Sequence, residues 1–233
     1  MQRDPLDTRC VPFAECSKSV GVAVFGTSHE DGVREPLVGQ GLVEGSTRLR
    51  RRRLHGTTLK VVLLEPGIVL PRLRGSFGRE YHWAADAATT QRMLPAGAAH
   101  GAVALAEHQS EGRGRLGRTW TDSALMFSVA VYPPQPVARW PELTLVAAHA
   151  VADAIGPGAT IKHPNDVLVD GRKAAGILAE AGERVVLGIG INVGGARWPG
   201  AGWVEADRLD LLVDVLDRLE RGYDTWASTL PSA

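Results

Sequence analysis

The sequence predicts a domain that combines helices with a sheet, and it argues against a Rossmann fold. Strand-like apolar runs precede one helical pattern, and a β-rich block follows it. The glycine pattern GRGRLG at 112–117 leads back into a strand instead of into a helix, and no second βαβ unit follows. The pattern therefore lacks the surroundings in which G-x-G-x-x-G binds a dinucleotide.

The predicted elements begin near residue 68. Residues 68–75 indicate a short helix or strand, and residues 79–87 a strand. Residues 88–95 open a helix with Thr89 or Thr90 near its N-cap. The apolar segments 101–109 and 124–132 predict two buried strands.

Two longer helices and a hairpin complete the predicted domain. Residues 141–156 carry apolar side chains at helical spacing, and Gly156 ends the pattern. Asp170-Gly171 separates two apolar runs, which predicts a β-hairpin, and residues 184–193 predict a further strand. The helix predicted at 206–226 presents one apolar face, formed by Leu209, Leu212, Val215, Leu216, Leu219, Tyr223 and Trp226.

Residues 1–67 are expected to form a poorly ordered basic extension. Glycine, proline and arginine interrupt every candidate element there, although 20–26 and 59–65 have strand-like compositions. An arginine run at 48–53 allows nucleic-acid contact, but a solvated run is the commoner case. No pair of helical patterns around a short turn indicates a helix-turn-helix, so DNA binding is not expected.

The composition is that of an ordinary globular protein. Of 233 residues, 44% are hydrophobic and 22% charged, and the formal net charge is zero, which gives no argument for a nucleic-acid or membrane partner. Cys10 and Cys16 have no further cysteine or nearby histidine to complete a zinc site. The sequence has no signal-peptide pattern and no apolar run of roughly 18 residues, so we expect a cytoplasmic protein.

The glycine loop concentrates positive charge. Arg113, Arg115 and Arg118 place three guanidinium groups close together, and guanidinium is the preferred fork for phosphate oxygens. Such a loop is typical of a lid that closes over an anionic ligand, with a solvated basic loop as the alternative.

A second group of polar residues flanks the predicted hairpin. Lys162 and Lys173 are suited to hold a polyphosphate and a substrate carbonyl, and Asp166 to bind Mg²⁺ through oxygen. The nearby strand contains Gly188 and Gly190, which permit close approach of a flat ligand. Taken one at a time, these residues also fit turn, surface and strand-end roles.

The motifs GRGRLGRTW (112–120), KHPNDVLVDGRKAAGILAE (162–180) and GIGINV (188–193) resemble three blocks of the biotin protein ligases. The segments AEHQ (106–109) and DAATTQ (86–91) are similar to two further family segments, so the resemblance spans roughly residues 70–226. It implies an α+β fold of the class II aminoacyl-tRNA synthetase and biotin ligase type, with a mixed β-sheet flanked by helices. Residues 68–233 would then form the catalytic domain, and the small β-barrel C-terminal domain of the family is expected to be absent.

The resemblance also implies an activity. Members of the family are ligases that use ATP and Mg²⁺ to convert biotin into biotinyl-5′-AMP, and they need no prosthetic group. They then form a C–N bond between the biotinyl group and a lysine of a biotin carboxyl carrier domain, which belongs to a biotin-dependent carboxylase. Some dimerise through the sheet of this domain, so a homodimer is a further expectation.

The family pattern implies a role for each matching residue. The catalytic residues would be Lys173, Arg115 and Arg118. Biotin would be bound by Thr89, Thr90, Gln109, Gly112, Arg113, Arg115, Lys173, Gly176 and Leu178. The nucleotide would be bound by Arg118, Trp120, Asn165 and Asn192, and Mg²⁺ by Asp166.

The sequence departs from the family pattern within two of these motifs. His163 replaces a tryptophan in the lysine-tryptophan-proline-asparagine-aspartate block, and Gln91 replaces the asparagine of a serine-threonine-asparagine signature. Three alternatives stand beside the ligase: a degenerate protein that binds biotin without catalysis, which the expected absence of the C-terminal domain motivates, a biotin-responsive transcriptional regulator and a lipoate ligase.

Overall fold

The computed structural model describes residues 57–114, 117, 119–120, 125–195 and 198–229, together with two short strands at 21–22 and 49–54. For the strands that precede residue 62, only the backbone is described. Most of the predicted basic extension, both cysteines, Arg115 and Arg118 therefore lie outside the described residues.

One mixed sheet organises the described domain. Its strands, in spatial order, are β1 (Gly21–Val22), β4 (Tyr81–Ala87), β5 (Val103–Gln109), β6 (Leu125–Val131), β10 (Val185–Ile191), β9 (Arg172–Ala181), β8 (Asp166–Val169) and β7 (Ala159–Lys162). Strands β4 and β5 run parallel, and the other neighbours run antiparallel. Strands β2 (Leu49–Leu54) and β3 (Thr57–Val62) form a separate hairpin.

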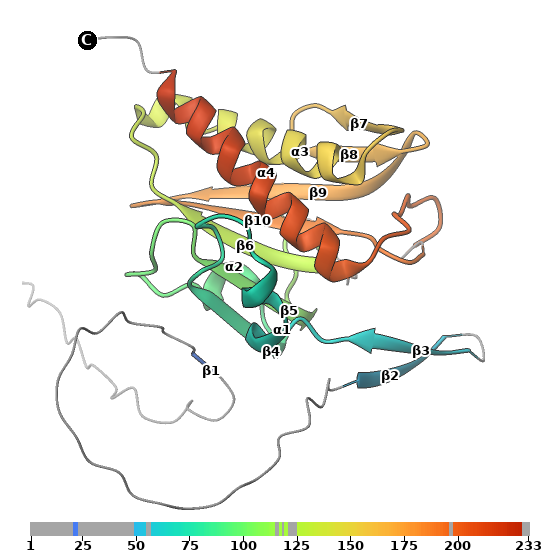
Figure 1. The fold of residues 1–233 in the computed structure, drawn as a ribbon. Coiled ribbons are helices and arrows are strands. Elements are labelled where there is room, and N and C mark those ends of the chain that lie inside the picture. Colours follow the sequence, from blue (N-terminus) through green and yellow to red (C-terminus); the bar gives the residue numbers. More distant parts are fainter. Residues whose placement is uncertain are drawn as a thin grey trace, which may run out of the picture.

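Helices cover the sheet, as the sequence predicts. The two long helices, α3 (Glu142–Ile155) and α4 (Arg208–Ser228), lie side by side across one face of it (Figure 1). The short elements are α1 (Pro66–Val69), η1 (Leu70–Arg72), α2 (Thr90–Met93) and η3 (Val137–Arg139). No helix among the described residues combines the length and apolar character needed to span a membrane.

Strict alternation along the central strands separates two faces. On β10, Leu187 and Ile189 point into the core under α3 and α4, so Gly188 and Gly190 lie on the opposite face. On β5, Val103 and Leu105 belong to the same core, whereas Ala104 packs with Leu94 and Ala98 in a smaller cluster behind α2. The large side chains of these strands therefore pack against α3 and α4, and the glycines and alanines between them leave the other face open.

Most of the predicted elements are confirmed. Strands β4, β5, β6, β9 and β10 and helices α2, α3 and α4 lie within a few residues of the ranges expected from sequence. The hairpin turn is confirmed by Asp170 and Gly171, whose φ angles of 51° and 72° fit a type I′ turn. Residues 66–72 are helical, which decides between helix and strand there. Strand β7 was not predicted, because its four residues are too few for alternation to indicate a strand clearly.

A buried ion pair joins the start of the packed core to the sheet and to α4. Glu107 on β5 lies 2.8 Å from the guanidinium of Arg208, and its other oxygen accepts bonds from Leu64 N–H and the indole of Trp83. Burial, and then the Glu107 carboxylate, raise the pKa of Tyr81 well above its usual value. The Tyr81 hydroxyl consequently keeps its proton and donates to Leu64 O. Leu64 is thereby part of the core, whereas the domain division near residue 67 stays a prediction.

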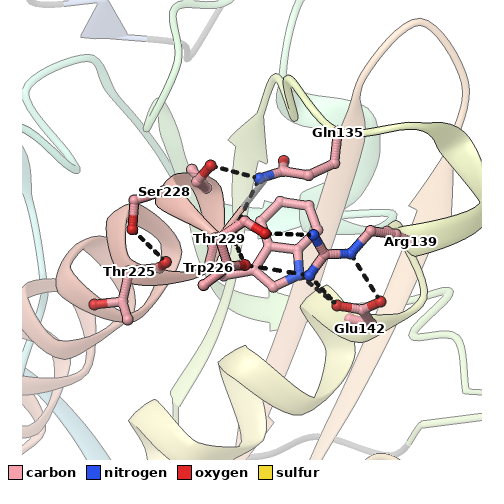
Figure 2. Close-up of polar contacts among 8 residues, drawn as sticks. Gln135, Arg139, Glu142, Thr225, Trp226, Ser228 and Thr229 are labelled. Carbon is pink, nitrogen blue, oxygen red and sulfur yellow. Dashed lines mark hydrogen bonds and ion pairs between the residues drawn. The ribbon is translucent and has the colours of Figure 1, made fainter. Parts of the chain in front are cut away.

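Side chains cap both ends of α4. Asp207 accepts bonds from two N–H groups of the first turn. At the other end, the amide of Gln135 donates to the carbonyls of Trp226 and Ala227, and the guanidinium of Arg139 donates to Thr229 (Figure 2). A cation at the C-terminal end opposes the negative end of the helix dipole, so this contact fixes α4 against the chain before α3.

The buried ion pair gives a stability prediction. Glu107→Gln should lower the free energy of unfolding by about 3 kcal/mol, because it leaves the Arg208 guanidinium buried without a counter-charge. Urea unfolding measures the change. Glu111→Gln, which removes the exposed pair with Arg92, is the matched control and should cost less than about 1 kcal/mol. Equal losses for the two variants would contradict the role given to Glu107.

Candidate functional site

The open face of the sheet carries a strip with three glycines, Gly176, Gly188 and Gly190. Gly190 on β10 pairs with Gly176 on β9, and two residues further along Gly188 pairs with Leu178. A β-strand normally covers each face with alternate side chains. The glycines therefore leave a hollow above the backbone of two adjacent strands.

The indole of Trp120 fills part of this hollow. A Cβ atom added at Gly190 would lie 2.5 Å from its Nε1, and one added at Gly176 would lie 2.8 Å from its Cζ3. Carbon atoms in contact normally stay about 3.5–4.0 Å apart, so neither position tolerates a side chain without movement of the ring. The ammonium of Lys173 lies 4.9 Å from the centroid of the Trp120 ring, within cation–π range.

A cavity on this face brings most of the predicted site residues together. Of the residues to which the family pattern gives a role, nine line it: Thr89, Thr90, Gln109, Arg113, Trp120, Asn165, Lys173, Gly176 and Leu178. The other described ones, Gly112, Asp166 and Asn192, lie outside its lining, and so does Lys162. Arg115 and Arg118 are outside the described residues, so their predicted roles stay predictions.

Lys173 is held by a carboxylate at the hairpin. Its Nζ lies 2.6 Å from Asp166 Oδ1, and both side chains are about one-quarter to one-third exposed. Asp166 begins β8, and its neighbour Asn165 fixes that start by donating from its amide to Ile177 O and accepting from Ile177 N–H. The hairpin predicted around Asp170-Gly171 pairs Lys173 with Leu168, two residues from Asp166, so the lysine can reach the aspartate diagonally across the strands.

The other end of the cavity is a buried polar network. Thr90 donates its N–H to Gln109 Oε1 at 2.7 Å, and its hydroxyl lies 2.7 Å from the hydroxyl of Ser128. Thr89, Thr90 and Ser128 are almost completely buried. Because buried polar groups are costly without partners, this end of the cavity is suited to a ligand with its own donors and acceptors.

The base of the glycine loop is closed. Trp120 N–H donates to Gly112 O at 2.8 Å, and a Cβ at Gly112 would lie 2.3 Å from Trp120 O. Next to this closure, the guanidinium of Arg113 forms a 2.9 Å ion pair with Glu180 on β9. Gly112 therefore acts through the loop geometry and lets Arg113 and Trp120 lie over the same strand.

Asn192 supports the site from behind. It is fully buried, and its amide donates to Gly202 O at 2.9 Å and to Lys173 O at 3.4 Å. Its own N–H donates to Ala174 O. These bonds stabilise the strand that carries Lys173, and the predicted contact between Asn192 and a nucleotide stays a prediction.

Several residues of the site do not follow from the sequence. Gln91 lines the cavity and donates to Leu178 O at 3.3 Å, and Glu180 and Ser128 pair with predicted residues. The alternate spacing of Gly188 and Gly190 was recognised from the sequence, whereas Glu180 and Ser128 had no such signal. Trp198 also packs against Trp120, with ring centroids 5.9 Å apart at an interplanar angle of 81°.

Comparison with known proteins shows what this chain is similar to. Residues 87–195 match the model of the Biotin/lipoate A/B protein ligase family. The chain is 43% identical over 136 residues to the Biotin--[acetyl-CoA-carboxylase] ligase of Mycobacterium tuberculosis, which covers 51% of this chain and 51% of that protein. It is 36% identical over 118 residues to the Bifunctional ligase/repressor BirA of Bacillus subtilis, with 45% of this chain and 36% of that protein covered. The chain thus spans about half the length, or less, of these curated relatives.

A solved structure has the same architecture. The biotin protein ligase from Aquifex aeolicus, in complex with biotin and ATP, superimposes with a TM-score of 0.58 at 28% sequence identity. The match covers 64% of this chain and 72% of that one. The mixed sheet with its flanking helices is therefore the fold of biotin protein ligase catalytic domains, as the resemblance implies.

The glycine strip gives a prediction that needs no ligand. Gly190→Ala should displace the Trp120 ring, change the near-ultraviolet circular dichroism and lower the free energy of unfolding by about 1–3 kcal/mol, since the added methyl group overpacks the site. Gly182→Ala is the control, because a Cβ there meets nothing within 4 Å. A Gly190→Ala protein with an unchanged spectrum would show that Trp120 does not lie against this strand.

Proposed function

We propose that the chain is a biotin protein ligase, which activates biotin with ATP and transfers the biotinyl group to a lysine of a carboxyl carrier domain. The observation that carries the proposal is the placement of Lys173 and Arg113, two cations, on one cavity whose far end is the buried Thr90–Gln109 network. A bicyclic ureido acid with one carboxylate matches a cavity that is polar at one end and cationic at the other.

In the first half-reaction, a biotin carboxylate oxygen attacks the α-phosphorus of ATP. A bond forms between that oxygen and phosphorus, the bond to the β-phosphate bridge oxygen breaks, and pyrophosphate leaves. Both reactants are anions, so a nearby ammonium or guanidinium stabilises the transition state by reducing their repulsion. We assign this role to Lys173 and Arg113, and extend it to Arg115 and Arg118 on the sequence pattern alone.

Two cations among the described residues of the site, Lys173 and Arg113, are already paired before any ligand arrives. Lys173 is bound to Asp166, and Arg113 to Glu180, so phosphate oxygens would replace carboxylates as their partners. Charge-assisted bonds to phosphate have the geometry that guanidinium favours. The exchange leaves Asp166 free beside the phosphates.

Asp166 is suited to hold Mg²⁺ in that arrangement. Mg²⁺ in nucleotide sites is usually bound by one or two carboxylates together with phosphate oxygens and water. The described residues contain no cluster of three or more histidine, cysteine or acidic side chains, so a site without phosphate is not expected there. When bound, the ion would neutralise phosphate charge, and Asn165 would keep its aspartate neighbour in position.

The ureido end of biotin is assigned to Thr89, Thr90 and Gln109. Thr89 and Thr90 are nearly completely buried, and Gln109 lies on β5 directly behind them. Gly176 and Leu178 would contact the ligand from β9, because Gly176 leaves room above the backbone. Trp120, with Asn165 and Asn192 further along, is assigned to the nucleotide side.

In the second half-reaction, the neutral amine of a carrier lysine attacks the carbonyl carbon of the mixed anhydride. The new C–N bond replaces the bond to the phosphate oxygen, AMP leaves, and the amine loses a proton. The anhydride also reacts with water, so the glycine loop must stay closed until the carrier docks. These steps use biotin, ATP and a carboxylase carrier, and the cytoplasmic location that the sequence predicts remains part of the proposal.

A groove beside the cavity is the proposed docking surface for the carrier. Residues 178–181 of β9 pair with β10, but in the described chain β8 ends its pairing with β9 at Gly176. The groove of about 360 Å³ next to this open edge is mainly apolar, and Ile177 and Leu178 line both the groove and the cavity. A carrier strand laid along the edge would bring its lysine to the anhydride. A second copy of this chain is the competing occupant.

Lys173 gives the first test. Lys173→Met should reduce biotin-dependent pyrophosphate release about 10²–10³-fold, since one transition-state donor is lost. Arg221→Met, at an exposed cation on α4, is the control and should retain wild-type rates. A wild-type protein that forms no biotinyl-AMP from biotin and MgATP would refute the proposed function.

The docking groove gives the second test. Val137 is 65% exposed in the groove, and Val137→Glu places a charge on its apolar lining. Transfer to a carrier domain, read as intact mass, should slow about tenfold because an unpaired charge is desolvated in the interface, while pyrophosphate release stays at the wild-type rate. Loss of both activities would point to misfolding, and loss of neither would place the carrier elsewhere. Sedimentation of wild type and variant distinguishes a second copy as the occupant.

A further inference from the structure

The segment 198–202 is attached to the backbone of Lys173. Gly202 N–H donates to Lys173 O at 2.9 Å, and a Cβ at Gly202 would lie 2.5 Å from Arg172 O. Gly202 O accepts the amide of the buried Asn192, and Ala201 N–H donates to Trp198 O. The segment that carries Trp198 therefore has a fixed position relative to β9 at the lysine itself.

This segment contributes an aromatic ring to the site. Trp198 is half-buried, and its ring packs against that of Trp120 in an edge-to-face arrangement with the centroids 5.9 Å apart. Aromatic pairs of this geometry contribute about 0.5–1.5 kcal/mol beyond the area that they bury. Trp120 is thus in contact with Gly176 and Gly190 of the sheet and with a ring from the 198–202 segment.

Trp120 in turn determines where the Lys173 ammonium lies. The ammonium is 4.9 Å from the Trp120 ring centroid and 2.6 Å from Asp166 Oδ1. An ammonium with four flexible carbons has many rotamers, and these two contacts restrict them. A shift of Trp120 would remove the contact between its ring and the ammonium. The ammonium could then move with the Asp166 carboxylate or turn into solvent.

We infer that Trp198 is a positioning residue for Lys173 and acts through the Trp120 ring. The inference rests on the proposed function for its kinetic consequence, but the contacts that it describes are independent of the reaction. Both ends of the chain of contacts are fixed to the same strand, since Lys173 O binds Gly202 and Lys173 Nζ faces Trp120. Trp198, Trp120 and Lys173 are therefore linked in a ring of contacts that begins and ends at Lys173.

The test compares Trp198→Ala, Trp198→Phe and, as a control shortly after the same segment, Glu205→Ala at an exposed position. Trp198→Ala should lower kcat for biotinyl-AMP formation about tenfold, in line with the coupling energies of residues in contact. The KM for biotin should stay within about twofold, because an interaction that matters only in the transition state changes kcat. Trp198→Phe retains an aromatic edge and should restore most of the rate.

A second measurement does not depend on activity. Trace acetylation of amines, read by mass spectrometry, reports the reactivity of Lys173 relative to the exposed Lys162 in the same molecule. The ratio should rise several-fold in Trp198→Ala and stay at the wild-type value in Trp198→Phe and Glu205→Ala.

The outcomes separate the inference from the proposed function. An unchanged acetylation ratio in a folded Trp198→Ala protein would overturn the inference, and so would a raised KM with an unchanged kcat, which would make Trp198 a ligand contact. If Trp198→Ala does not fold, Trp198→Phe with an altered acetylation ratio would overturn it as well. If wild type makes no biotinyl-AMP, the proposed function fails, and the acetylation ratio still decides the role of Trp198.

Discussion

The close approach of the Trp120 ring to the paired glycines of β9 and β10 is the contact on which the site depends. Gly176 and Gly190 face each other across the two strands, and neither leaves room for a methyl group beneath the ring. A single side chain on either strand would lift Trp120 and would move the surface against which the Lys173 ammonium lies. The requirement for glycine therefore comes from packing between layers, because no turn or positive φ angle is involved at these two positions.

Side chains alternate between the two faces of the sheet, so one face packs the core and the other carries the candidate site. Residues such as Leu187 and Ile189 bury their side chains under α3 and α4, and the intervening glycines open the other face. The same strands are thus rigid because one face is fully packed, and they are accessible because the other face is nearly bare. Caps at both ends of α4 and the Glu107–Arg208 pair fix the helix layer, so the site strands have a firm support. A site on strands of this kind can hold a ligand without large backbone movement.

The sequence was sufficient for the elements and for most of the cavity lining. Local signals decided these cases: Asp170-Gly171 indicates a tight hairpin turn, and the hairpin pairs Lys173 with Leu168, two residues from Asp166. The site residues that the sequence did not reveal contact partners that are far away along the chain. Ser128 reaches Thr90 because β6 lies between β5 and β10, and Glu180 meets Arg113 because the loop folds back over β9. Strand order and register are not encoded in any short window, so such partners need the tertiary structure.

The internal ion pairs explain how such a site distinguishes its ligands. The pairs Lys173–Asp166 and Arg113–Glu180 are partly exposed, and exposed pairs are worth only about 0–1 kcal/mol. A neutral ligand gains nothing by breaking them, whereas a polyphosphate offers several oxygens to each cation and releases both carboxylates. Asp166, once released, lies next to the newly bound phosphates, where its charge is unfavourable unless a cation accompanies the ligand. Under the proposed function, the arrangement of two cations and two carboxylates would therefore favour a nucleotide that arrives with its metal ion over a free one.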